Sequence, residues 1–169
     1  MRGKWAAGIP PRNFAWVIKD RLAISERPGG YARNHRKVRR QEEIIWLREQ
    51  GFNRIVSVLA SPHNLHAYEE AAFPYSHFPI GPHDDVRELL PNLYESMRSW
   101  MAGGERLLVH QEELGDRLVG IMGGFLLWTK MLTSTTQAIV IVEQIAGRQL
   151  GPPGREIVNL VPDLMGSAR

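Results

Sequence analysis

The stretch RLLVHQEELGDRLVGIMGGF, Arg106 to Phe125, decides the fold of this chain. Its residues 107–110, LLVH, predict a short buried strand, and the polar, glycine-containing loop 111–116 follows. The apolar run after the loop is too long for a strand and predicts a buried helix. Loop amides and the unpaired N–H groups of a helix N-terminus converge at such a junction, with the positive end of the helix dipole behind them. The stretch therefore predicts an oxyanion-binding loop.

The order of residues in this loop resembles the signature loop of the dual-specificity and tyrosine phosphatases, in which a histidine and a cysteine are followed by five residues and an arginine. Here the frame begins at His110 and ends at Arg117, and Gln111 stands where the family has its nucleophilic cysteine. The residues between are Glu112, Glu113, Leu114, Gly115 and Asp116. The resemblance implies that residues 110–117 are the ligand-binding loop.

Gln111 excludes the family's chemistry from this loop. In the family a thiolate attacks phosphorus, and loop amides and helix dipole keep it ionised. A carboxamide has no ionisable proton, and the chain contains no cysteine. What remains is Arg117, whose planar guanidinium can hold a phosphate or carboxylate with two hydrogen bonds.

Further departures from the family bear on binding. Leu114 stands where the family has a glycine, and Leu118 where it has a hydroxyl residue. Three carboxylates, those of Glu112, Glu113 and Asp116, surround a loop that should attract anions. Two interpretations stay open: the carboxylates repel an anion, by about 1 to 4 kcal/mol per pair of charges at 4 Å, or they point to solvent.

The loop between the predicted strand Tyr75–Ile80 and the next helix bears on acid catalysis. In the family this loop carries the aspartic acid that protonates the leaving group. The matching position falls near Gly81, so Asp84 serves as the acid only if the loop shifts. Asp84 and Asp85 are candidate vestigial acids, but we expect them to cap the following helix, where carboxylates are favoured.

The order of predicted elements extends the resemblance to most of the chain. The opening hairpin NFAWVIKDRLAIS and the later stretch TTQAIVIVEQIAGRQLGP also resemble the family. The implied fold is α/β, a mostly parallel sheet of about five strands with helices on both faces. We expect a flexible basic arm over 1–12, one domain over 13–161 and a tail over 162–169. The predicted elements are a hairpin of Phe14–Ile18 and Leu22–Ser25, strands Arg54–Leu59 and Tyr75–Ile80, and helices Gln41–Gln50, His63–Ala72, Val86–Ala102, Leu118–Leu132 and Thr135–Ala146, then a turn over 151–154 and a short element, Arg155–Leu160.

Composition narrows the classes of function. The 169 residues are 43% hydrophobic, which suits one domain with a sizeable core. No membrane span or signal peptide is expected. The absence of cysteine excludes disulfides and thiolate metal sites and favours a cytoplasmic protein. The basic stretch Tyr31–Arg40 lacks the aromatic residues and motifs of nucleic-acid binding, so we expect no nucleic-acid partner.

Charge is distributed unevenly. Residues 1–54 carry thirteen Lys/Arg against five Asp/Glu, and residues 55–169 carry eight against thirteen. Such asymmetry predicts a basic face able to meet an acidic partner, including another copy of the chain.

Three hypotheses for function follow. The first is a catalytically inactive phosphatase-like protein without a cofactor, which binds a protein partner or a phosphorylated ligand. The second is a hydrolase with non-cysteine chemistry, in which His83, Asp84, His110, Glu112 and Glu113 hold a metal that activates water. The third is a self-assembling subunit joined through its basic and acidic surfaces.

Overall fold

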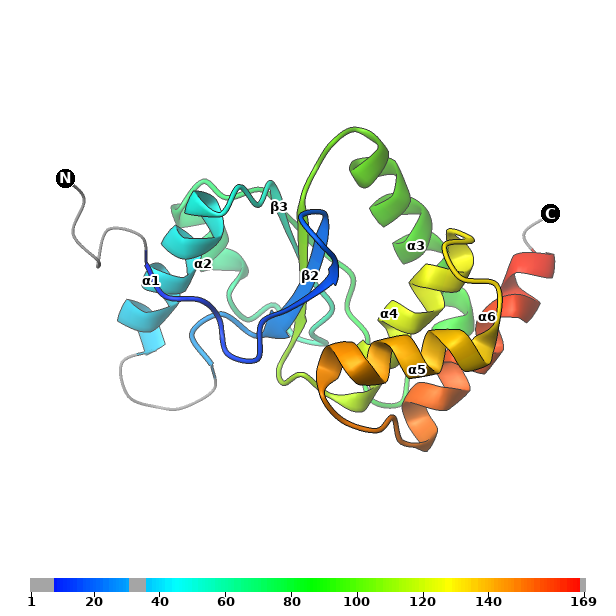
Figure 1. The fold of residues 1–169 in the computed structure, drawn as a ribbon. Helices are drawn as coiled ribbons and strands as arrows, with labels where there is room; N and C mark the ends of the chain where they lie inside the picture. The colour runs from blue at the N-terminus through cyan, green and yellow to red at the C-terminus, as the bar shows by residue number, and fades with distance from the viewer. Residues whose placement is uncertain (1–7, 31–35, 168–169) are drawn as a thin grey trace.

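The computed structural model describes residues 8–30 and 36–167, and their centre is a five-stranded sheet (Figure 1). The strands lie in the order β1 (Ala15–Ile18), β2 (Leu22–Glu26), β5 (Leu107–Gln111), β3 (Arg54–Ser57) and β4 (Tyr75–His77). The hairpin β1–β2 is antiparallel, and the other three pairings are parallel. The predicted α/β fold with a mostly parallel sheet is therefore confirmed, and the strand of the signature stretch is central.

Helices cover both faces of the sheet, as predicted (Figure 1). One face packs against α1 (Arg36–Glu49) and α2 (Leu65–Glu70), through a core that includes Leu47, Tyr68 and Phe73. The other face packs against α3 (Val86–Ala102), α4 (Asp116–Trp128), α5 (Thr135–Ala146) and α6 (Pro152–Ser167).

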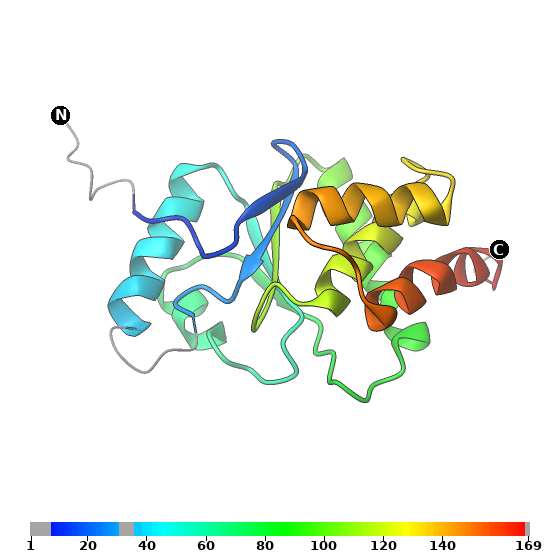
Figure 2. The same cartoon turned by 60° about the horizontal axis from the view of Figure 1, so that its bottom comes forward.

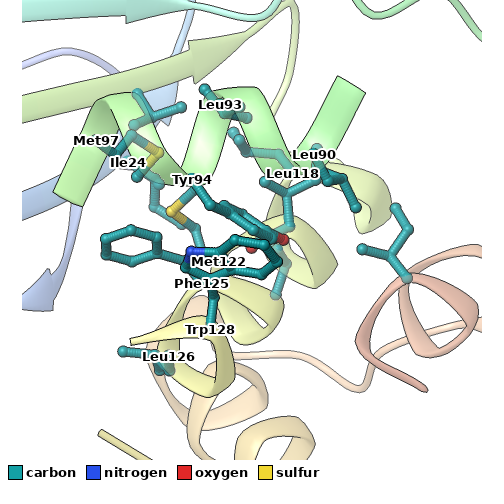
Figure 3. Packing of buried hydrophobic residues seen from close by; sticks show 14 of the residues in the cluster. Ile24, Leu90, Leu93, Tyr94, Met97, Leu118, Met122, Phe125, Leu126 and Trp128 are labelled. Atoms are coloured by element: carbon teal, nitrogen blue, oxygen red, sulfur yellow. The ribbon is translucent and has the colours of Figure 1, made fainter. Parts of the chain in front are cut away.

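Helix α4 is the centre of the larger core: every residue from Leu118 to Trp128 is buried. Tyr94 of α3 packs against Phe125 and Trp128 of α4, with ring centroids 5.8 and 5.7 Å apart (Figure 3). Glycines let neighbouring helices approach. A Cβ on Gly120 would lie 2.6 Å from Cα of Gly154, and one on Gly124 would lie 2.7 Å from Val161. The close packing at Gly120 and Gly124 thus depends on the absence of a side chain at both positions.

The C-terminal part differs from the prediction. Residues 151–154 were expected to form a turn, yet Pro152 begins a helix that continues to Ser167, well beyond Leu160. Proline is well tolerated in the first helical turn because its missing N–H has no helical partner there. The glycine and prolines around Gly151 indicate a turn. They do not show which distant residue accepts hydrogen bonds from the free N–H groups at the start of α6.

Smaller differences concern helix faces and ends. The helical pattern of Gln41–Gln50 predicts Ile44, Ile45 and Leu47 on the inner face of the helix, but Ile45 is 37% exposed in α1. The pair Ser61-Pro62 is typical of an N-cap and first helical turn, but α2 begins only at Leu65, after Asn64, whose φ is 74°. Strands β3 and β4 end at Ser57 and His77, earlier than predicted.

Three predicted segments lie partly outside the described residues: the arm (1–12, described from residue 8), the basic stretch 31–40 (described from residue 36) and the tail (162–169, described to residue 167). Among the described residues, the structure contains no helix with the length and apolar character required to cross a membrane.

Candidate functional site

The signature loop joins the end of the central strand to the start of the buried helix. Gln111 is the last residue of β5 and lies beside Glu26 of β2, and His110 lies between Ser25 and Ser57 on the two neighbouring strands. The loop ends at Gly115, whose extended backbone (φ −86°, ψ 172°) precedes the first helical residue, Asp116. The strand–loop–helix arrangement required for an oxyanion site is present, with the N-terminus of α4 at the loop.

His110 faces the protein interior and is fully buried. Its Nε2 lies 2.9 Å from the hydroxyl of Tyr68, and its Nδ1 lies 3.2 Å from the carbonyl oxygen of Gln111. Burial lowers the pKa of His110 from its ordinary 6.5 to about 4. Asn64 extends the chain of polar contacts, donating to the Pro28 carbonyl over 2.7 Å and lying 3.2 Å from the Tyr68 hydroxyl. His110 is therefore a neutral brace of the loop.

The loop carboxylates are directed away from an anion site. Asp116 accepts hydrogen bonds from the backbone N–H groups of Gly151 and Gly154, each over 2.6 Å, and so caps the N-terminus of α6. Glu112 forms an ion pair with Arg27 over 3.3 Å. Glu113 is exposed. Of the three carboxylates, only that of Glu113 points to solvent as the second interpretation expects, whereas those of Asp116 and Glu112 are held by groups outside the loop.

Arg117 contacts the loop that follows β4. Its Nη1 donates to the Gly81 carbonyl over 2.8 Å, and the N–H of the same Gly81 donates to Asp84 over 2.6 Å. Asp85 is the N-cap of α3 and accepts from the Arg87 N–H over 2.9 Å. The predicted capping role is confirmed for Asp85, whereas Asp84 fixes a turn within its own loop.

A cavity of about 700 Å³ lies between segment 82–87 and α6. Figure 2 shows the chain leading into α3 below the sheet, on the side where α6 begins. Among the described residues, Arg117 is the only one of the frame 110–117 that lines the cavity, and Arg87 also lines it. Val86 and Ile157 give it apolar surface, and Glu156 lies on its α6 side. Sequence reasoning missed this cavity because one wall is a helix that was predicted as a turn.

The residues of the metal hypothesis are not brought together. His110 points to Tyr68, Asp84 is bound to the Gly81 N–H, and Glu112 is paired with Arg27. Within residues 8–30 and 36–167 no group of three or more His, Asp or Glu side chains is arranged to hold a metal ion. His63 and His66, which share three-residue spacing, are exposed, and His66 pairs with Glu70 over 2.8 Å.

The fold is similar to that of solved phosphatase structures. A kinase associated phosphatase with its catalytic cysteine substituted by serine gives a TM-score of 0.75 at 17% sequence identity, over 93% of this chain and 97% of that chain. A variant of human DUSP28 gives a TM-score of 0.66 at 17% sequence identity, and the match covers 95% of this chain and 100% of that chain. The human tyrosine phosphatase-like serine/threonine/tyrosine-interacting protein gives a TM-score of 0.65 at 13% sequence identity, and the match covers 92% of this chain and 97% of that chain.

Neither a protein-family model nor a curated protein matches the sequence. Identities this low show the fold alone. The chain thus has a fold like that of the dual-specificity and tyrosine phosphatases, and it contains no cysteine.

Proposed function

We propose that this protein is a catalytically inactive phosphatase-like binding protein, and that Arg117 contacts an anionic, phosphorylated ligand or partner. The observation that carries the proposal is Gln111 at the end of the central strand, at the junction where the phosphatases hold their nucleophile. The loop frame and its helix N-terminus are retained around a residue that cannot attack phosphorus. Retention of the frame without a nucleophile supports binding instead of turnover.

The contacts around the loop support an anion as the ligand. The carboxylates of Asp116 and Glu112 are engaged with groups outside the loop, namely the N–H groups of Gly151 and Gly154 and the side chain of Arg27. The bond to Gly81 uses one of the five N–H groups of the Arg117 guanidinium, and the same side chain lines the cavity together with Arg87. The two guanidinium groups offer charge-assisted donors to a phosphate group, in a cavity that the carboxylates of Asp84, Asp85, Glu156 and Asp163 also line.

Calorimetric titration of the purified protein with phosphotyrosine and with a phosphopeptide tests this proposal. We expect Arg117→Gln to weaken binding at least tenfold. Arg98→Gln is the matched control, because Arg98 lies on α3 and pairs with a carboxylate of its own helix, that of Glu95, over 2.7 Å. Circular dichroism verifies that both variants are folded. Equal affinities of the two variants for the phosphopeptide would refute an Arg117 site.

A further inference from the structure

A second hollow lies on the opposite face of the sheet, between α1 and α2. Its volume is about 290 Å³, too small for most whole ligands but large enough for one or two side chains of a docked peptide. We call it the α1–α2 groove. It is lined by three cations, Lys37, Arg40 and Arg48, by the apolar residues Ile44, Ile45, Ala67 and Ala71, and by Gln41 and Glu70.

The cations lie at both ends of the groove and are held in place. Arg40 Nη1 donates to Asn64 Oδ1 over 3.4 Å, at the start of α2, and Arg48 Nη2 donates to the Ala71 carbonyl over 2.5 Å, at its end. Each bond uses one of five guanidinium N–H groups. Both arginines therefore retain donors for a further acceptor.

The floor of the groove is apolar, and part of it is exposed. Ile44 is buried, whereas Ile45 is 37% exposed although the helical pattern of α1 predicted it inside. An isoleucine beside a small hollow lined by Ala67 and Ala71 offers a contact for an inserted apolar side chain.

The charge balance identifies the occupant. The lining contains one carboxylate, that of Glu70, which lies 2.8 Å from Nε2 of the exposed His66. The groove thus presents three cations and one carboxylate around an apolar floor, and all three cations lie on α1, in the half of the chain with thirteen basic against five acidic residues. From Lys37 to Arg48 is eleven residues of helix, about 16 Å at 1.5 Å per residue. We propose that the α1–α2 groove binds an acidic peptide segment of a partner protein, with carboxylates on the cations and an apolar side chain on the Ile45 floor.

Fluorescence anisotropy with labelled twelve-residue peptides tests the proposal at physiological ionic strength, where charges beyond about 8 Å are screened. One probe is acidic with two leucines four residues apart, a second is acidic with serines in their place, and a third is basic with the leucines kept. The full-length protein should bind the first most tightly and the basic probe not at all.

Two pairs of variants distinguish binding in the groove from nonspecific electrostatic or apolar attraction to the protein surface. Lys37→Glu should weaken the leucine-containing acidic peptide roughly tenfold, whereas Lys19→Glu, an exposed turn lysine in the β1–β2 hairpin, should leave it unchanged. Ile45→Ser should weaken it several-fold, and Val140→Ser, 46% exposed on α5, should not.

Three results would overturn the proposal. Equal losses in Lys37→Glu and Lys19→Glu would show only diffuse charge attraction. Tighter binding of a twelve-nucleotide single-stranded DNA, lost in Lys37→Glu, would reassign the groove to nucleic acid. A dimer seen by sedimentation velocity and dissolved by Lys37→Glu would make the occupant a second copy of the chain. These three results do not depend on the Arg117 site, which lies on the other side of the sheet.

Discussion

Replacement of Asp116 by alanine should destabilise the protein strongly, although Asp116 lies in a loop frame that the sequence assigns to ligand binding. Its carboxylate accepts from the N–H groups of Gly151 and Gly154, each over 2.6 Å, and Gly154 is buried. A hydrogen bond to a charged group contributes about 1.5–3 kcal/mol. The carboxylate is 22% exposed, and its ion pair with the half-exposed Arg148 is 3.7 Å long and adds little. We therefore expect a loss of about 2–4 kcal/mol in the free energy of unfolding.

Urea unfolding followed by circular dichroism measures this loss, and a thermal scan should show a Tm lower by roughly 5–15 °C for a chain of this size. Asp116→Asn should fall between wild type and alanine, because an amide offers one acceptor oxygen instead of two. Glu113→Ala is the matched control: Glu113 is exposed in the same loop, and its removal should change stability by less than about 0.5 kcal/mol. If Asp116→Ala is as stable as Glu113→Ala, the capping of α6 by Asp116 is wrong.

Three further predictions concern packing, pH and activity. Gly120→Ala should destabilise by about 1–3 kcal/mol, since its Cβ would lie 2.6 Å from the Gly154 Cα, whereas Gly115→Ala, with nothing within 4 Å, should be neutral in the same unfolding assay. His110 has a pKa of about 4 when folded against 6.5 ordinarily, so the unfolded chain binds the proton first and stability falls as pH drops below about 6.5. Between pH 7 and pH 5.5 the free energy of unfolding of the wild-type protein should fall by about 1 kcal/mol more than that of His110→Gln. If the free energies of unfolding of the two proteins depend on pH in the same way, His110 is not a neutral buried histidine. Para-nitrophenyl phosphate should not be hydrolysed by the wild-type protein, and Gln111→Cys should give at most trace turnover, because Asp84 is bound to Gly81 and Leu118 offers no hydroxyl. Robust turnover by Gln111→Cys would show a site that lacks the nucleophile alone.

The sequence by itself determined the order of elements and the identity of the central strand. Residues 107–110 are apolar on both faces apart from His110, and the run from Leu118 to Trp128 is apolar all round, so burial of both was dictated locally. That residue 111 cannot act as a nucleophile was equally readable, because a carboxamide has the same chemistry in any fold. The Asp85 cap was predictable for a similar reason, since an N-cap carboxylate bonds an amide two or three residues away.

Only the tertiary structure decided where the polar side chains of the site point. Asp116 and Glu112 stand within one loop, yet one bonds amides thirty-five and thirty-eight residues away and the other pairs with Arg27 on the segment after β2. Spacing along the chain carries no information on such distant partners. The same holds for α6: its first residues read as a turn because the carboxylate that satisfies their amides belongs to another helix. The cavity beside Arg117 and the α1–α2 groove exist only once these helices pack, which is why neither could be read from the order of residues.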